Sequence, residues 1–235
     1  LEENKMGGCV SVQADQSEKE TEFLLALANQ NDFIKGVVGW VDLKSEKIQE
    51  RLSFYSGSLK LKGFRHVVQG EADGFLAQKE FQRGVNTLKQ FNFTYDILVY
   101  SRQLGEVIEF AKKFPDQKFV IDHIAKPTIK DKEFHSWAKH IESIGSMRNV
   151  FCKLSGMVTE ANWKIWKSED FTPYLDHVME CFGSNRLMYG SDWPVCLVAA
   201  SYPQQLGLVE SYISRLSISE KESIMGGNAV RFYNL

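Results

Sequence analysis

The feature that most constrains this sequence is a regular alternation of two kinds of segment. Short strand-like apolar runs alternate with longer amphipathic stretches, and the runs begin roughly 25 to 35 residues apart, which is the size of a βα unit. This alternation favours an α/β fold with a parallel sheet and helices packed outside it. The predicted strands are Gly7–Gln13, Ile34–Asp42, Leu61–Val68, Tyr95–Tyr100, Lys118–Ile124, Val150–Gly156 and Leu187–Trp193.

Helix signals occupy the intervals between these runs. Capping boxes of the Ser-x-x-Glu type begin at Ser17 and Ser217, each ahead of an amphipathic stretch. Thr172-Pro173 places a cap residue before a proline at the first helical position, and Gly183 is suited to end that helix. These signals predict that helices connect the strands.

Composition narrows the class of protein. The chain has 235 residues, of which 43% are hydrophobic and 25% charged, and it contains no linker-like segment, so we expect one domain over residues 1–235. The net charge of −2 and the lack of a basic stripe argue against nucleic-acid binding. No apolar run reaches the roughly 18 residues of a membrane span, and no signal peptide is recognisable. Without a Cys-x-x-Cys pair among the four cysteines, we expect a cytoplasmic protein.

Polar residues at the strand ends help to choose between two architectures. In a closed barrel these ends form one ring around one mouth, whereas an open doubly wound sheet gathers its site residues near one switch point. The polar residues are spread evenly over nearly all the runs, and no Gly-x-Gly-x-x-Gly follows any strand, so a TIM (β/α)8 barrel is favoured. The sequence supplies seven of the eight strands.

Two strand ends carry groups suited to chemistry. Ile121-Asp122-His123 places an acid and an imidazole after a buried run, and Gly190-Ser191-Asp192-Trp193-Pro194 ends another run in a carboxylate. Burying such groups is costly unless they are paired, hydrogen-bonded or bound to metal. The alternative for Asp122 and Asp192 is that each caps the following helix.

These two runs, together with residues 37–42, 63–66, 153–156 and 227–233, resemble the amidohydrolase 2 family of the amidohydrolase superfamily. The similarity is greatest to its lactonase branch of L-fuconolactonase-like and L-rhamnonolactonase-like enzymes, and it covers nearly the whole chain in order. The family carries a His-x-His pair at the end of its first strand, and this sequence has none. The chain begins at what matches the second strand, so we expect that the first strand is missing from it.

The resemblance implies a hydrolase of carbohydrate metabolism that opens a sugar-acid lactone. Asp192 would take a proton from water, and His123 would polarise the carbonyl. The resemblance leaves open catalysis without metal or with one divalent metal, such as zinc, held by His123 and Asp192. The candidates for substrate binding are Arg65, Tyr100, Trp193 and Trp40, with Lys126 and Lys153 as further candidates.

Two other functions stay open at this point. One is a decarboxylase or carbon–carbon hydrolase of the same superfamily, and the other is a catalytically inactive barrel used for binding. The Asp-Trp-Pro-Val continuation after Ser191 favours the lactonases by resemblance. The expected partner is a small-molecule lactone, and a homo-oligomer is left open. His66, His135, His140 and His177 are expected to serve packing or to lie at the surface.

Overall fold

The computed structural model describes residues 2–235 and contains a seven-stranded parallel sheet. The order of the strands in the sheet follows the order of the chain, from β1 to β7, and every neighbouring pair is parallel. Each predicted run overlaps one strand, so the predicted α/β class is confirmed. The strands are β1 Cys9–Val12, β2 Ile34–Gly39, β3 Leu61–His66, β4 Thr94–Ile97, β5 Phe119–Ile121, β6 Val150–Leu154 and β7 Leu187–Tyr189.

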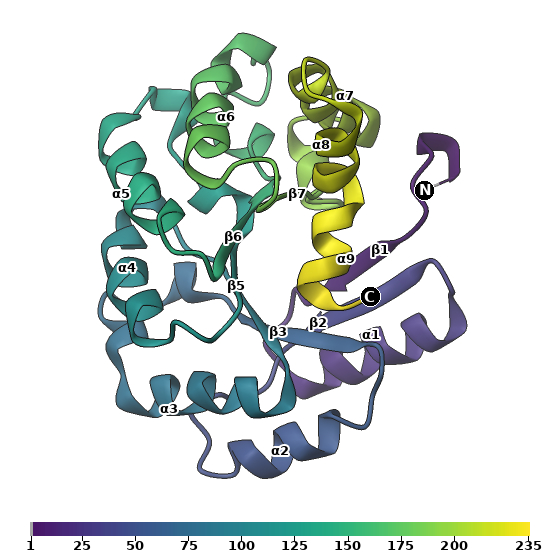
Figure 1. The fold of residues 1–235 in the computed structure, drawn as a ribbon, viewed down its shortest axis with the longest axis vertical. Helices are drawn as coiled ribbons and strands as arrows, with labels where there is room; N and C mark the ends of the chain where they lie inside the picture. Colours follow the sequence, from purple (N-terminus) through teal and green to yellow (C-terminus); the bar gives the residue numbers. More distant parts are fainter. Residues whose placement is uncertain (1) are drawn as a thin grey trace.

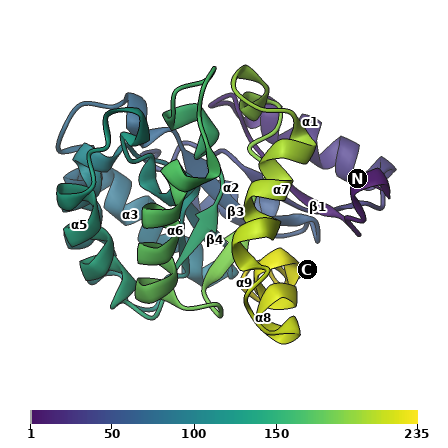
Figure 2. The same cartoon turned by 90° about the horizontal axis from the view of Figure 1, so that it is seen from above.

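Helices surround the sheet on its outer side, as Figures 1 and 2 show from two directions. Within residues 2–235, no helix is both long enough and apolar enough to span a lipid bilayer. The helices are α1 Glu18–Gln30, α2 Ile48–Tyr55, α3 Lys79–Leu88, α4 Leu104–Lys113, α5 His135–Gly145, α6 Ser168–Phe182, α7 Tyr202–Ile213, α8 Ile218–Glu222 and α9 Asn228–Tyr233.

The predicted helix signals are confirmed at three places and wrong at one. The hydroxyls of Ser17 and Ser217 accept backbone hydrogen bonds at the starts of α1 and α8, and Gly183 ends α6 with φ 66°. However, α6 does not start at Thr172. The backbone N–H of Lys167 donates to the Asp170 carboxylate at 2.8 Å, which starts the helix one turn earlier and leaves Pro173 inside it.

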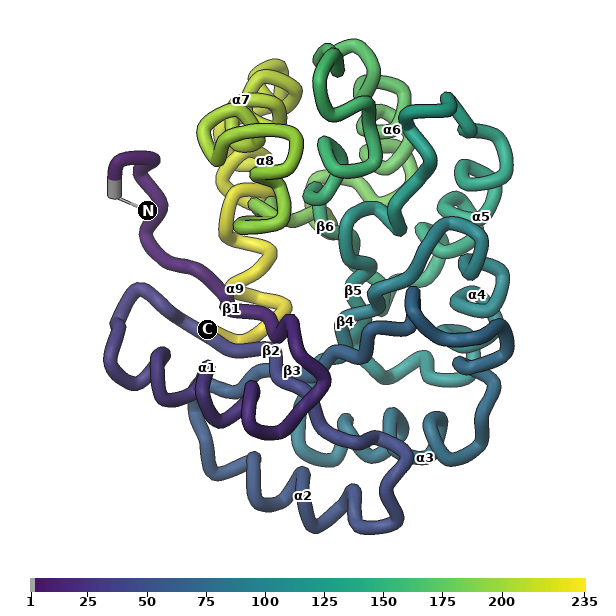
Figure 3. Tube along the Cα trace, turned by 180° about the vertical axis from the view of Figure 1, so that it is seen from behind, coloured from purple at the N-terminus to yellow at the C-terminus, as the bar shows by residue number. Residues whose placement is uncertain are grey.

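The sheet curls so that β1 and β7 form its two edges. Within residues 2–235 these two strands are not paired with each other. The helices follow the curl in an incomplete ring that is open between β1 and α7 (Figures 1 and 3). Consecutive parallel strands with helices outside are the arrangement of a TIM barrel. The sheet is therefore barrel-like, and the closed eight-stranded barrel with its first strand outside this chain stays a prediction.

The outer core lies between the sheet and the helices. Side chains alternate between the two faces of a strand, so every second residue points to the helices. Phe64, Tyr95 and Phe119 point outward in this way, and Phe81 of α3 and Phe110 of α4 pack against Tyr95 with ring centroids 6.0 and 6.4 Å away. Full burial of such a side chain stabilises the fold by about 1.5–3 kcal/mol.

Two side chains at the end of α9 pack against the inner face of the curled sheet. Phe232 and Tyr233 of α9 pack in one cluster with the inward side chains of β2, β5 and β7, which are Val38, Val120 and Met188. The Phe232 ring also lies 4.9 Å from that of Phe151 on β6. The start of α9 is anchored because the Asn228 amide donates to the carbonyls of Ser184 and Leu187. The interior is thus packed with side chains.

Candidate active site

A layer of charged side chains lies next to this apolar filling, toward the carboxyl ends of the strands. It contains Arg65 of β3, Asp96 of β4, Asp122 directly after β5 and Lys153 of β6, which we call the inner ion network. Lys153 Nζ lies 2.5 Å from Asp96 Oδ2 and 2.7 Å from Asp122 Oδ1. Arg65 Nη1 donates to Asp122 Oδ2 at 2.8 Å, and the Tyr233 hydroxyl donates to Asp96 Oδ2 at 2.7 Å. The network therefore joins four strands and α9.

The inner ion network balances two carboxylates against two cations. Asp96 and Asp122 are fully buried, so their charges must be compensated inside the protein. Burial opposes ionisation of Asp122, but Lys153 and then Arg65 hold its pKa well below the usual range. Burial likewise opposes the charge on Lys153, and the two carboxylates nevertheless raise its pKa. Burial raises the pKa of Asp96, although Lys153 acts in the opposite direction. The polar groups of the network are thus directed at one another.

A left-handed turn follows β5. His123, Ile124, Ala125 and Lys126 all have positive φ, at 55°, 46°, 59° and 47°. Left-handed backbone costs a residue other than glycine roughly 1–2 kcal/mol. The Lys126 N–H donates to the His123 carbonyl at 2.8 Å, and the indole N–H of Trp137 donates to the Ile124 carbonyl at 2.7 Å. Strain held in this way is concentrated at functional sites in proteins, and here it sets the direction of His123 and Lys126.

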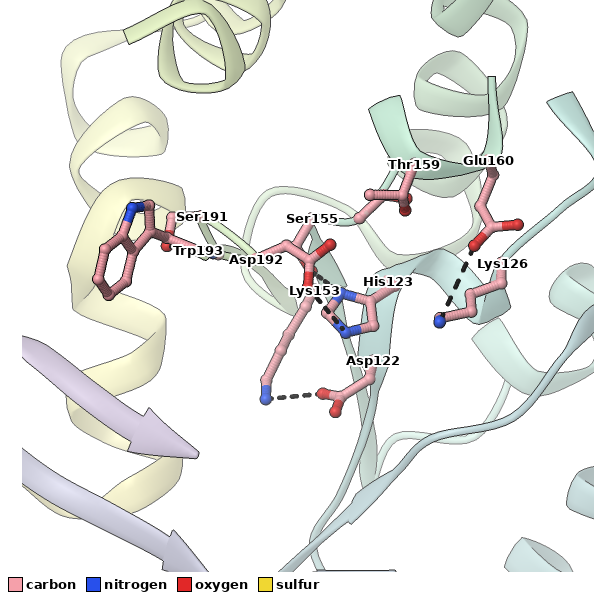
Figure 4. Close-up of polar contacts among 12 residues, drawn as sticks. Asp122, His123, Lys126, Lys153, Ser155, Thr159, Glu160, Ser191, Asp192 and Trp193 are labelled. Atoms are coloured by element: carbon pink, nitrogen blue, oxygen red, sulfur yellow. Dashed lines mark hydrogen bonds and ion pairs between the residues drawn. The ribbon is translucent and has the colours of Figure 1, made fainter. Parts of the chain in front are cut away.

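His123 and Asp192 meet beyond the carboxyl ends of β5 and β7, at the end of the curled sheet that we call the opening (Figure 4). His123 Nε2 lies 3.6 Å from Asp192 Oδ1, and His123 Nδ1 lies 2.9 Å from the Ser155 hydroxyl. Gly156 makes room for the imidazole: it has φ 63°, and a Cβ there would lie 2.6 Å from His123 Cγ. Asp192 is itself left-handed, with φ 54°. The positive φ angles of His123, Gly156 and Asp192 therefore position the imidazole and the carboxylate.

Burial tunes both members of this pair. It raises the pKa of Asp192 to about 6, although the nearby Lys126 acts in the opposite direction. It lowers the pKa of His123 to about 3, although Asp122 opposes the change. At neutral pH the imidazole is neutral, and Asp192 is a carboxylate whose pKa lies about one unit below the pH. Such a carboxylate suits a general base.

The structure brings together most of the residues singled out in the sequence. Asp192 and His123 share one opening, and Arg65 lies beneath them in the inner ion network. Tyr100 is 39% exposed, and its ring centroid lies 5.5 Å from Lys126 Nζ. Trp193 follows Asp192 directly and is 61% exposed. These two aromatic side chains lie near the opening with exposed surface.

Trp40 is not brought to this group. Its indole N–H donates to His66 Nδ1 at 3.3 Å, and the His66 ring stacks on Phe75 with centroids 4.7 Å apart. Because His66 follows Arg65 along β3, alternation puts the two side chains on opposite faces of the sheet. Trp40 therefore contacts the helix side. His66 packs there as expected.

Two acidic residues at the site had no place in the sequence analysis. Asp96 lies within the strand Thr94–Ile97, where an ionisable residue in an otherwise apolar run was the signal. Glu160 ends the short turn Val158–Glu160 after β6, and its Oε1 lies 3.9 Å from Lys126 Nζ. No sequence pattern distinguishes Glu160 from the other loop carboxylates.

The site offers few side chains that could bind a metal ion. Within residues 2–235, His123 and Asp192 converge, but no group of three or more His, Cys, Asp or Glu side chains is placed to hold a metal. A catalytic zinc ion usually takes three protein ligands. These described residues therefore do not complete a zinc site by themselves.

A carboxylate and an imidazole over the end of a curled parallel sheet are the arrangement of a barrel hydrolase. The sequence model described as amidohydrolase matches residues 3–235, and the chain belongs to the amidohydrolase family. The L-fucono-1,5-lactonase of Burkholderia multivorans is 40% identical over 242 residues, which cover 98% of this chain and 81% of that protein. The L-fucono-1,5-lactonase of Burkholderia ambifaria is 33% identical over 233 residues, which cover 96% and 79%.

A solved structure agrees with this assignment. The crystal structure of an amidohydrolase from Burkholderia multivorans with bound zinc has a TM-score of 0.93 and 41% identity, covering 97% of this chain and 84% of that one. The family predicted from the sequence motifs is confirmed.

Proposed function

We propose that this protein hydrolyses a sugar-acid lactone, an aldonolactone such as L-fucono- or L-rhamnonolactone. The observation that carries the proposal is the 3.6 Å approach of Asp192 Oδ1 to His123 Nε2 at the end of a barrel-like sheet. Relatives at 40% and 33% identity are L-fucono-1,5-lactonases, which favours this substrate class over the decarboxylases and carbon–carbon hydrolases of the superfamily.

Asp192 has the role of general base in the proposed reaction. Its carboxylate takes a proton from water as the water oxygen attacks the lactone carbonyl carbon. The tetrahedral intermediate then collapses, the bond between the carbonyl carbon and the ring oxygen breaks, and Asp192 returns its proton to the leaving alkoxide. The product is the open hydroxy acid, and Asp192 is again a carboxylate.

His123 has the role of stabilising the oxyanion. When the Ser155 hydroxyl donates to Nδ1, the proton of the neutral imidazole lies on Nε2, which faces Asp192 and the opening. An N–H aimed at the developing oxyanion stabilises the transition state more than the ground state. The low pKa of His123 keeps the imidazole neutral in this role.

The remaining candidates are proposed to bind the substrate. Tyr100 and Trp193 offer exposed aromatic faces to a sugar ring. Arg65 contributes its positive charge beneath the site, since its two Nη atoms already donate to Asp122 and to the Gln13 carbonyl. Trp40 is not included, because it packs against His66.

Metal use is the second property to measure. The zinc bound in the relative from Burkholderia multivorans supports a divalent metal here, with His123 and Asp192 as the described residues that would contact it. No step is assigned to the metal, because these residues do not complete a site. Elemental analysis of the purified protein, and turnover before and after chelation, decide whether a metal is bound and needed.

The test of the proposed function is a panel of aldonolactones assayed by proton release. We expect Asp192→Asn to lower kcat by about 10²–10⁴-fold, the usual contribution of general acid–base catalysis. The control is Asp73→Asn, which changes an exposed carboxylate in an ion pair with Arg102. Near-normal turnover in Asp192→Asn would contradict the base role, and a wild type that opens no lactone would contradict the function itself.

A further inference from the structure

A second pair of opposite charges lies beside His123. Lys126 ends the left-handed turn after β5, and Glu160 ends the short turn after β6. Their charged atoms are 3.9 Å apart, and the side chains are 16% and 21% exposed. Figure 4 shows both on the opposite side of His123 from Trp193. Two separate loops thus hold one half-buried ion pair next to the catalytic groups.

The Lys126–Glu160 pair keeps its hydrogen-bonding capacity, unlike the inner ion network. A separation of 3.9 Å exceeds a hydrogen bond, and in the described part of the chain neither charged group makes another one. Lys126 therefore retains three N–H donors, and Glu160 retains the lone pairs of two oxygens. Lys153, by contrast, lies within 2.7 Å of two carboxylates. The polar atoms of Lys126 and Glu160 are therefore available to a ligand.

This pair lies close enough to act on a substrate held by Asp192. Figure 4 shows Lys126 and Glu160 beside His123, whose Nε2 lies 3.6 Å from Asp192 Oδ1. Tyr100, which is 39% exposed, borders the same space with its ring centroid 5.5 Å from Lys126 Nζ. A ring bound at Asp192 would therefore meet a cation, an anion and an apolar surface.

The chemistry of a sugar lactone matches these three features. The carbonyl and the ring oxygen take part in the reaction, and the remaining ring carbons carry neighbouring hydroxyls. Each hydroxyl both donates and accepts. An ammonium beside a carboxylate complements two such hydroxyls, since one accepts from Lys126 while its neighbour donates to Glu160. Hydrogen bonds to charged groups are roughly twice as strong as neutral ones, which makes them effective in selection.

We propose that Lys126 and Glu160 form a subsite that recognises a vicinal diol on the lactone ring and thereby selects sugar lactones over plain lactones. The inference rests on the proposed function and deepens it. Lys126 and Glu160 act here on substrate binding. They take no part in the bond-breaking steps, which belong to Asp192 and His123.

The test compares two lactones of equal ring size, a polyhydroxylated 1,5-aldonolactone and unsubstituted δ-valerolactone. The variants are Lys126→Met and Glu160→Gln. The matched controls are Lys112→Met and Glu109→Gln, which change an exposed ion pair on α4. We expect kcat/KM for the aldonolactone to fall about 10–100-fold through a rise in KM, as loss of a hydrogen bond to a charged group predicts. The rate with δ-valerolactone should stay within about twofold of the wild-type rate.

Several outcomes overturn the proposal. An equal loss with both lactones indicates a general effect on the site, a loss in kcat alone indicates a role in the chemical step, and no loss excludes contact with the hydroxyls. The ratio of the two rates does not depend on the fraction of folded protein, so poor folding cannot imitate selection. A wild type inert toward every lactone overturns the proposed function together with the subsite, whereas an active wild type with unchanged selectivity in both variants overturns the subsite alone.

Discussion

The inner ion network and the groups at the opening are made of the same residue types, but their packing differs. Inside the sheet, Lys153 Nζ lies 2.5 Å from the Asp96 carboxylate and 2.7 Å from the Asp122 carboxylate. At the opening, His123 and Asp192 are 3.6 Å apart, and Lys126 and Glu160 are 3.9 Å apart. The inner charges are paired at hydrogen-bond distance and join four strands, whereas the outer pairs lie beyond that distance. Removing a charge should therefore have opposite consequences in the two regions.

The largest effect on stability is expected for Lys153→Met. The change leaves Asp96 and Asp122 buried with their shared cation gone, and breaking a buried pair typically costs about 3–5 kcal/mol. The free energy of unfolding in denaturant measures this loss. Arg102→Met is the control, because it removes an exposed partner of Asp73 and should cost less than about 1 kcal/mol. Equal costs in the two variants would mean that water already compensates the inner charges.

Gly156→Ala should have the next largest effect. A Cβ would lie 2.6 Å from the His123 ring at a backbone φ of 63°, so strain and overpacking add to about 2–4 kcal/mol. Turnover should fall as well, because the imidazole is displaced from Asp192. Gly207→Ala on α7 is the control: its Cβ meets nothing within 4 Å, and the change should slightly stabilise the helix. An active, stable Gly156→Ala variant would show that His123 tolerates movement.

At the opening, removal of a charge should stabilise the fold. The folded-state pKa of Asp192 is about 6, above its ordinary value of 3.8, so ionised Asp192 destabilises the protein above pH 6. Asp192→Asn should therefore raise the free energy of unfolding at pH 7.5 by about 1–3 kcal/mol. The gain should vanish below about pH 4, where the carboxyl is protonated in both states. Unfolding curves at the two pH values test this, and an Asn variant less stable than wild type at pH 7.5 would contradict it.

The pKa of Asp192 also predicts how the rate of the reaction depends on pH. Protonated Asp192 cannot accept a proton from water, so wild-type kcat/KM should fall about tenfold per pH unit below about 6 and be level above it. A pH–rate profile with the aldonolactone measures this. A flat profile down to pH 4.5 would show that Asp192 is not the titrating base.

The smallest effect is expected for Trp137→Phe, which removes the donor to the Ile124 carbonyl beneath the left-handed turn. The free energy of unfolding should fall by about 1 kcal/mol. We also expect a few-fold fall in kcat/KM, because the turn directs His123 and Lys126. Trp163→Phe is the matched control: Trp163 also donates to a carbonyl, that of Thr159, but is 54% exposed. If both changes have the same effect on turnover, the turn does not depend on Trp137.

The sequence predicted the strands well because apolar alternation records burial directly. It did not predict where β5 ends. The predicted run continues past Asp122 and His123 to the apolar Ile124, yet the strand stops at Ile121, because nothing in Ile124 or Ala125 signals a positive φ. The start of α6 was misplaced for a related reason: the Asp170 carboxylate caps the Lys167 N–H, and this competes with the stronger signal of Thr172-Pro173.

The site residues that lie in sequence motifs could be predicted. The contacts that depend on the register of the strands could not. Asp192 and His123 follow from two motifs, whereas the contact between Lys153 and Asp96 requires the register of three strands. Trp40 shows the limit of reading strand ends alone, since its backbone position did not reveal that its indole meets His66 on the other face.

The packing of α9 has a consequence for the order of folding during synthesis. Phe232 and Tyr233 fill the space enclosed by strands whose residues are translated up to about two hundred positions earlier. Until residues 228–233 have left the ribosome, Val38 and Val120 have no apolar neighbour from that end of the chain, and Asp96 lacks the Tyr233 hydroxyl. The interior of the sheet can therefore exclude water only after α9 has been synthesised.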